Sequence, residues 1–297
     1  MFKKIAFFAL FLAVTGLFAA TSVNAQRLVK GGLVMSVEPT VDTLIQPEAN
    51  PAVNLDQCQN GANTEPPTLV NCGPGWANGN ANGNNSHYDE GTNIHYRAIF
   101  TNLVPGTLYT VTFAFDKTHS AGGGDYTKNA IDYINNYDAT AVGYTVDPCY
   151  NGAQTALCTG GPVLIPIPDD PGILFDPAGR FLAGWGIAPV CVAVNTPVGC
   201  EPLTAVAPVG GWVSPTSNTT HEQQFSVTFR AIDTTAVLAW SGHIATASDW
   251  NTLQETSASS IQGSPYHMRV SGNTGWGGQQ DRSLSTTAVV GTSAAGV

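Results

Sequence analysis

The chain has 297 residues, of which 43% are hydrophobic and only 11% are charged. This charged share is well below the roughly 25% of an average soluble domain, which argues against a helical bundle or a coiled coil. The 11 basic residues stand against 21 acidic ones, so no nucleic-acid partner is expected. The apolar share excludes a wholly disordered chain, and 32 glycines with 19 prolines favour a β-rich, loop-rich protein.

Residues 1–25 have the layout of a secretory signal peptide. Two lysines precede an apolar stretch at 5–18, and small residues follow at Val23 and Ala25, where a signal peptidase would cut. The stretch is short for a membrane span, and an uncleaved anchor is the weaker alternative. We therefore expect a secreted, acidic chain without a membrane span, free outside the cell or associated with its surface.

Six cysteines in an exported chain predict disulfides, because no tight CxxC spacing of a zinc site is present. Several connectivities are open, and pairing between sequence neighbours is the simplest, since each such pair brackets a Gly/Asn/Pro-rich loop. The predicted pairs are Cys58–Cys72, Cys149–Cys158 and Cys191–Cys200. A bridge from Cys72 to Cys149 across the intervening strands is the alternative.

After the leader, we divide the chain into an extended segment (26–52), one domain (53–292) and a tail (293–297). An opening strand is predicted at 33–37, and Asn-Gly steps predict tight turns over 71–91. Alternating strands are predicted at 95–100, 108–115, 225–230, 236–240, 266–270 and 283–289. Residues 130–134 fit either one helical turn or an edge strand.

Residues 148–224 break this pattern, with four cysteines, many prolines and no sustained periodicity. We expect a loop-rich insertion pinned by two disulfides, with one strand near 163–167, as a small satellite lobe around Trp185. Many short strands without long helices predict an all-β fold, an antiparallel β-sandwich or jelly roll that carries this insertion.

Residues 103–111 read LVPGTLYTV, which is similar to the corner before a strand in fibronectin-type sandwiches. There a tyrosine hydroxyl bonds back to the preceding turn, a role that falls to Tyr109 in this chain.

A wider set of segments carries a second likeness. They are LDQC at 55–58, WANGN at 76–80, NSHYDEG at 85–91, YR at 96–97, LVPG at 103–106, AIDY at 130–133, DPC at 147–149, WSGHIA at 240–245, DW at 249–250, GSPYHM at 263–268 and QDRS at 280–283. Together they resemble a widespread domain of secreted bacterial surface proteins. The resemblance implies one large β-sandwich over residues 53–292 at the front of a cell-surface or matrix protein. The family has no assigned catalytic activity, so no site residue is implied.

No nucleophile elbow, HExxH motif, EF-hand loop or phosphate-binding glycine loop is present. Carboxylates at strand ends, together with backbone carbonyls, make calcium sites, so Ca²⁺ is the one cofactor considered. The candidates are Asp116, Asp132, Asp147, Asp249 and Asp281. The alternative is that such aspartates close Asx turns. His243 and His267 lie beside aromatic residues and fit either a metal pair or ordinary buried imidazoles.

Tryptophans among Gly, Asn and Gln favour a carbohydrate-binding surface. Trp76 and Trp276 could stack on sugars, and Asn78 and Asn80 could supply uncharged hydrogen bonds. The alternative is that these rings pack in the interior, as large apolar side chains usually do.

We therefore expect an extracellular structural or adhesive module of a cell surface or matrix, without catalysis. Residues 27–37 alternate weakly and could add a strand to a second copy of the chain, because few basic residues protect the sheet edges. The segment could also fold back on its own sheet. The alternative functions are a carbohydrate-binding module for surface glycans and, second, a secreted hydrolase, since spatially paired carboxylates leave no sequence signature.

Overall fold

The structure is a computed structural model. It describes residues 50–118, 130–139, 141, 143–152, 157–171, 177–188, 190–191, 201–202, 207–210, 212, 221–249, 258–272, 276–277 and 279–291. The leader, the strand expected at 33–37 and the segment 27–37 lie outside these residues, as does the tail 293–297.

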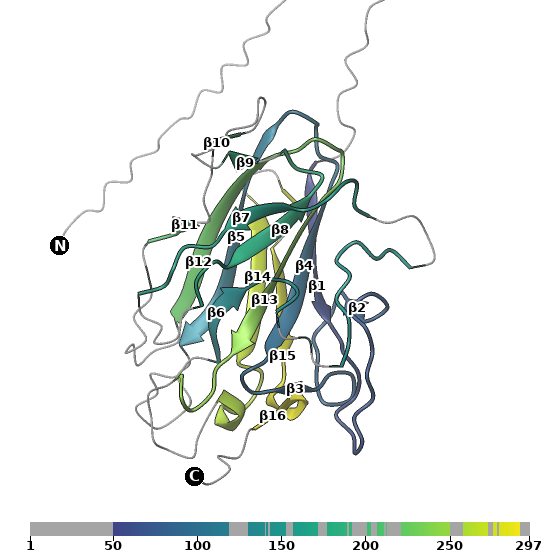
Figure 1. Cartoon of the computed structure of the whole chain (residues 1–297), viewed down its shortest axis with the longest axis vertical. Helices are drawn as coiled ribbons and strands as arrows, with labels where there is room; N and C mark the ends of the chain where they lie inside the picture. The colour runs from purple at the N-terminus through teal and green to yellow at the C-terminus, as the bar shows by residue number, and fades with distance from the viewer. Residues whose placement is uncertain are drawn as a thin grey trace, which may run out of the picture. The chain divides into compact units, whose positions relative to one another are not determined.

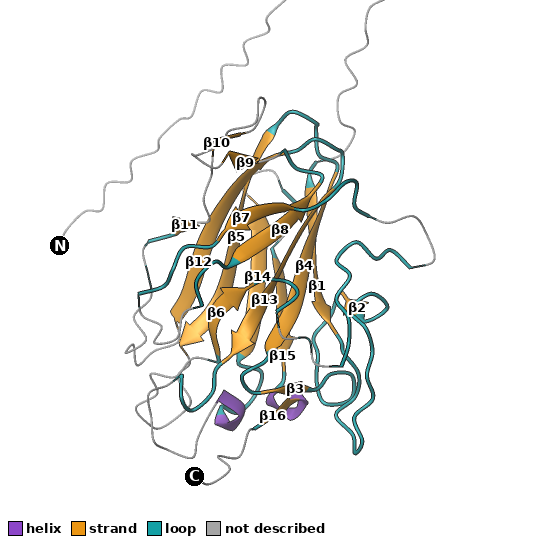
Figure 2. Ribbon diagram, viewed as in Figure 1, coloured by secondary structure: helices purple, strands orange, loops and turns teal. Residues whose placement is uncertain are grey.

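The described chain forms two antiparallel sheets (Figures 1 and 2). The first sheet has the order β2-β1-β4-β13-β8-β7, with β6 also paired to β13. Its strands are β1 Ala52–Cys58, β2 Trp76–Ala77, β4 Asn93–Thr101, β6 Ile131–Asn135, β7 Val163–Pro166, β8 Phe181–Trp185 and β13 Ala236–Ile244. The second sheet has the order β11-β12-β5-β14-β15. Its strands are β5 Leu108–Thr118, β11 Ala207–Pro208, β12 His221–Arg230, β14 Tyr266–Gly272 and β15 Gln280–Leu284.

Short elements complete the described part. Two parallel pairs join β3 (Tyr88–Asp89) to β16 (Val289–Val290) and β9 (Val190–Cys191) to β10 (Glu201–Pro202). The helical elements are single 3-10 turns, η1 (Ala258–Ser260) and η2 (Thr286–Ala288), drawn near β3 and β16 in Figure 2. No helix within the described ranges has the length and apolar character to cross a membrane.

Aromatic rings fill the space between the two sheets. Phe113 of β5 meets Trp240 of β13 with ring centroids 4.5 Å apart. Trp240 donates its indole N–H to the Met268 sulfur of β14 at 3.4 Å. Phe100 of β4 packs against Phe229 of β12 at 5.4 Å. These contacts make the fold a sandwich, which confirms the predicted all-β class.

The first sheet is covered on its other face as well. All nine residues of β13 are buried, although alternate ones point away from the second sheet. A small apolar cluster on that outer face joins Val237 and Ala239 to Trp185, with Cys149 and Cys158 packed against it. Within the segment expected as a satellite lobe, β7 and β8 are instead part of the main fold, because they extend the first sheet next to β13.

The structure confirms two predicted disulfides, Cys58–Cys72 and Cys149–Cys158. They indicate an oxidising, extracellular type of environment. Cys200 lies outside the described residues, so the third pair stays a prediction.

Several local predictions can also be compared with the structure. The Tyr109 hydroxyl accepts a hydrogen bond from the backbone N–H of Val104 at 2.8 Å, so the predicted corner is confirmed. Of residues 130–134, all but the first belong to a strand, β6, and not to a helical turn. The strand expected at 283–289 begins earlier, as β15, and gives way to η2, because the Ser285 side chain accepts the N–H of Thr287 and starts a helical turn.

Candidate functional site

Three potential metal ligands meet where β6 pairs with the end of β13. Asp132 lies on β6, His243 lies on β13, and Asp249 lies in the turn that follows β13. One ligand atom of each residue lies within 4.8 Å of the other two. His243 Nδ1 is 2.8 Å from Asp132 Oδ1. Two of the five aspartates considered for calcium thus come together, beside one of the two candidate histidines.

Burial and neighbouring charges shift the pKa values of Asp132 and His243. Burial raises the pKa of Asp132, although the hydrogen bond and the charge of His243 act the other way. Burial alone would lower the pKa of His243, but its hydrogen bond to Asp132, with the charges of Asp132 and Asp249, raises that pKa overall. The contact between Nδ1 and Oδ1 thus opposes the effect of burial on the pKa of both residues.

Neighbouring groups fix the three side chains. Asp249 Oδ2 accepts both the backbone N–H and the hydroxyl of Thr246, each at 2.7 Å. The backbone N–H of Tyr133 donates to Asp132 Oδ1 at 3.0 Å. The Tyr133 ring stacks on the His243 imidazole, with centroids 4.5 Å apart and planes inclined by 7°. Such outer contacts orient ligands before an ion arrives.

The other three aspartates lie elsewhere and bind protein groups. Asp147 Oδ1 accepts the N–H of Cys149 at 3.0 Å, which is the Asx turn of the alternative interpretation. Asp116 and Asp281 both bind Arg269 on the outer face of the second sheet, at 2.5 and 3.2 Å. A guanidinium already occupies the place that a cation would need between these two carboxylates.

The candidate histidines do not form a pair. His267 lies on β14 in the second sheet, where its Nδ1 is 3.0 Å from Asp281 Oδ1 on the outer face. His243 belongs to the first sheet and has its own carboxylate partners.

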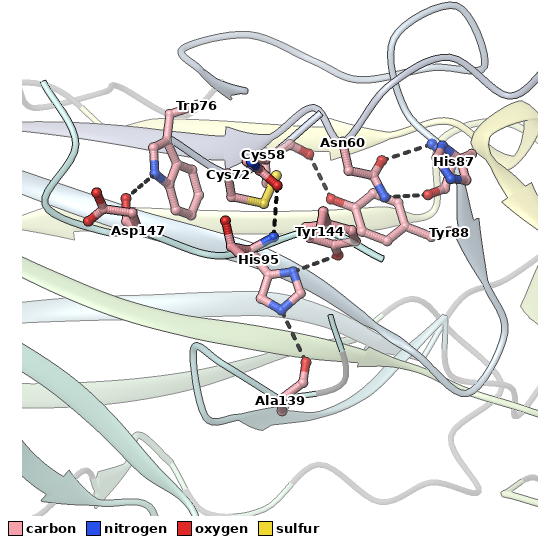
Figure 3. Close-up of a disulfide and its surroundings, with 12 residues drawn as sticks. Cys58, Asn60, Cys72, Trp76, His87, Tyr88, His95, Ala139, Tyr144 and Asp147 are labelled. Carbon is pink, nitrogen blue, oxygen red and sulfur yellow. Dashed lines mark hydrogen bonds between the residues drawn. A yellow bond between two sulfur atoms is a disulfide. The ribbon is translucent and has the colours of Figure 1, made fainter. Parts of the chain in front are cut away.

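Trp76 is partly open to solvent and lies near the Cys58–Cys72 disulfide (Figure 3). Its indole N–H donates to the Asp147 carbonyl at 2.8 Å, and the Arg97 guanidinium carbon lies 5.0 Å from its ring centroid. A shallow hollow of about 320 Å³ adjoins this ring. The hollow is lined by uncharged residues, among them Gln59, Thr68, Trp76, Asn84 and Asn85. Amides beside an aromatic ring suit sugar hydroxyls.

The two asparagines expected to assist Trp76 are engaged within the protein. The Asn78 side chain hydrogen-bonds Asn54 and Arg282. Asn80 Oδ1 accepts the N–H of Ser283 at 3.0 Å. Both amides therefore fix the segment around residues 78–80 to the neighbouring strands.

Trp276 does not lie with Trp76. Its ring packs edge-on against Phe100 and Tyr109, with centroids 5.5 and 5.4 Å apart. The residue after it bridges to the first residue of β1, whereas Trp76 pairs with the last, Cys58. The length of β1, about 20 Å at roughly 3.3 Å per residue, separates the two rings.

A second cavity, of about 310 Å³, is lined by residues of several loops and of β3, among them Asn60, His87, Tyr88 and Tyr144. Asn60 accepts the N–H of His87 at 2.9 Å, and the Tyr88 hydroxyl donates to the Cys58 carbonyl at 2.7 Å (Figure 3). The volume is at the lower end for small-molecule sites. The sequence contains no motif for this cavity, because its walls come from separate loops.

Beneath this cavity lies a buried histidine. His95 Nδ1 is 3.0 Å from the Tyr144 hydroxyl, and Nε2 is 3.1 Å from the Ala139 carbonyl (Figure 3). Burial lowers the pKa of His95 to about 4, so this imidazole is neutral at physiological pH. The second nitrogen donates to a carbonyl, which leaves Nδ1 to accept from the tyrosine.

The chain matches no protein-family model, no curated protein and no solved structure.

Proposed function

We propose that this protein is an extracellular structural or adhesive module without catalysis. The proposal rests on the contacts that the cationic side chains make within the protein. Within the described ranges there are six Lys and Arg residues, and each is bound to a group of the protein itself. They are Arg97, Lys117, Arg180, Arg230, Arg269 and Arg282.

Most of these cations are buried. Lys117 is 0% exposed and pairs with Asp170, while Arg97 pairs with Asp56 on the neighbouring strand at 2.9 Å. Arg97 also donates to the carbonyls of Pro148 and Tyr150, at 3.0 and 2.6 Å, which ties the outer loops to the sheet. The described surface then presents carboxylates, amides and hydroxyls. Such a surface repels anionic partners and suits a module that has to persist in solution.

Adhesion between copies needs an accessible strand edge. The edge strands in the described part of the chain differ in length and in how far they are covered. β2 and β11 have two residues each, and the edge of β15 is covered because the Ala81 backbone bonds Ser283 and Ser285 at 2.9 Å. Of the two longer edge strands, β6 is buried over its first four residues, whereas β7 has four residues with Leu164 49% exposed. We propose β7 as the edge that accepts residues 27–37 of a second copy.

Sedimentation velocity and electron microscopy on the purified chain test this function. We expect ordered assemblies at raised concentration. Deletion of residues 26–37 should abolish these assemblies without unfolding the chain, and Leu164→Lys should weaken them by placing a charge on the accepting edge.

Ile232→Lys is the matched control. It alters another exposed apolar residue, 54% accessible and outside the strands, and should leave assembly intact. A chain that stays monomeric at every concentration contradicts the adhesive role, and turnover of polysaccharides or peptides contradicts the absence of catalysis.

The second candidate function is carbohydrate binding, favoured by the uncharged hollow beside Trp76. A glycan array tests it directly. If the hollow binds sugars, Trp76→Ala should remove the signal, whereas Trp276→Ala, at the far end of β1, should not. An array without any signal for the intact chain would exclude this function in favour of the structural one.

A further inference from the structure

The cluster of Asp132, His243 and Asp249 contains a feature that its internal hydrogen bonds do not explain. The carboxylate of Asp132 is 2% exposed, and its Oδ2 atom has no hydrogen-bond partner within the described part of the chain. Its other oxygen is fully engaged, by the His243 ring and by the Tyr133 N–H. A buried carboxylate oxygen without a donor is unfavourable, and a bound ion is one way to satisfy it.

The geometry of the three side chains suits a cation. Ligand atoms of all three residues lie within 4.8 Å of one another, close enough for one ion to contact all of them after small shifts. Two carboxylates and a neutral imidazole would balance the charge of a divalent ion.

The kinds of ligand atom distinguish between metals. Ca²⁺ takes six to eight oxygen atoms, and the cluster offers two carboxylates and one nitrogen. Zn²⁺ accepts imidazole nitrogen and carboxylate oxygen together, in a shell of four with water completing three protein ligands. The imidazole among the three ligands therefore favours zinc over the calcium considered from the sequence.

We propose that Asp132, His243 and Asp249 form a zinc site that ties β6 to the end of β13 and to the turn after it. Zinc in this site takes one carboxylate oxygen from each aspartate and one imidazole nitrogen from His243. The site is independent of the adhesive role, since it is built within one chain.

Isothermal titration of the full, untagged chain with zinc, after removal of metals by a chelator, tests the proposal. We expect one Zn²⁺ per chain, a rise in melting temperature on binding and no displacement of zinc by millimolar Ca²⁺. His243→Gln and Asp249→Asn should each weaken zinc binding at least about tenfold, the lower end of the effect of losing even an outer-shell partner. A Co²⁺-loaded sample should show a d–d spectrum that His243→Gln abolishes.

Matched controls separate lost binding from lost folding. His267→Gln and Asp281→Asn alter the exposed His–Asp pair of the second sheet and should bind zinc as the parent does. Asp249→Asn retains an oxygen for Thr246, so its metal-free melting temperature should match that of the metal-free parent. If His243→Gln fails to fold, Asp249→Asn decides the question. The proposal is wrong if zinc does not bind, if Asp249→Asn binds it unchanged, or if Ca²⁺ binds this site more tightly than Zn²⁺.

Discussion

The outer faces of the two sheets differ in their exposure to solvent. On the outer face of the first sheet, Asp56, His95 and Arg97 are all less than 10% exposed, because loops after β6 close over them. On the outer face of the second sheet, the side chains of Arg269 and Asp281 are 19% and 44% exposed. The two faces carry the same kinds of residue in different dielectric surroundings.

This difference sets what each polar group contributes to stability. A buried ion pair is costly to break, since the remaining charge is left without water or a partner. A surface pair is screened, and its loss costs little. The covered face should therefore hold the fold together, while the open face carries hydroxyls and ion pairs that substitutions can change.

The largest effect is expected from breaking the buried pair. Asp56→Ala leaves the Arg97 guanidinium without its carboxylate on a covered face, and should lower the free energy of unfolding by about 3–5 kcal/mol. Urea unfolding followed by tryptophan fluorescence measures this. The double variant Asp56→Ala, Arg97→Met removes both charges and should recover part of the loss. A cost below about 1 kcal/mol for Asp56→Ala would show that the loops open to water.

Next comes the pH dependence of His95. Its folded-state pKa is about 4, below the unfolded value near 6.5, so the unfolded chain binds more protons between these values. Stability should fall as the pH drops from about 6.5 to 4, by about 3 kcal/mol, and change no further through this group below pH 4. In His95→Gln this contribution should vanish, while the carboxylates contribute alike to both proteins. Identical pH profiles for the two proteins would contradict the burial of a neutral imidazole.

The disulfide Cys149–Cys158 holds the loops that cover the first sheet. Its sequence separation of nine residues predicts a loss of about 2–3 kcal/mol when both cysteines become alanine. Hydrogen exchange should then speed up in β4 and in residues 143–152, and remain slow in β5 and β12. Uniformly faster exchange in both sheets would mean that the cover is not a separate unit.

The same contrast explains what could be predicted from the sequence. β5 and β12 were predicted because one face of the second sheet is open, so apolar and polar residues alternate along them. β1 and β8 were not predicted. They are covered on both faces, as β4 and β13 are, but β4 and β13 are rich in apolar residues, whereas β1 and β8 carry residues such as Asp56 and Gly184 within them.

The candidate site was predictable in its residue types but not in its grouping. Asp132, Asp249 and His243 were all candidates, yet Asp132 and His243 are 111 positions apart. They meet only because β6 pairs with β13, and strand pairing over that distance leaves no local pattern. The unpartnered oxygen of Asp132 is likewise a property of packing alone.

The smallest effect is expected on the open face. Asp281→Ala removes one of three carboxylates around Arg269, and Asp116 and Glu222 remain bound to it at 2.5 and 2.7 Å. Burial alone would lower the pKa of Arg269, but its bonds to Asp116 and the charges of all three acids raise it, so the guanidinium stays charged and paired after the substitution. Because Asp281 is 44% exposed, the loss should be about 0–1 kcal/mol and should shrink further at high salt. Urea unfolding at low and high salt measures both quantities. A loss as large as that of Asp56→Ala would show that burial does not distinguish the two faces.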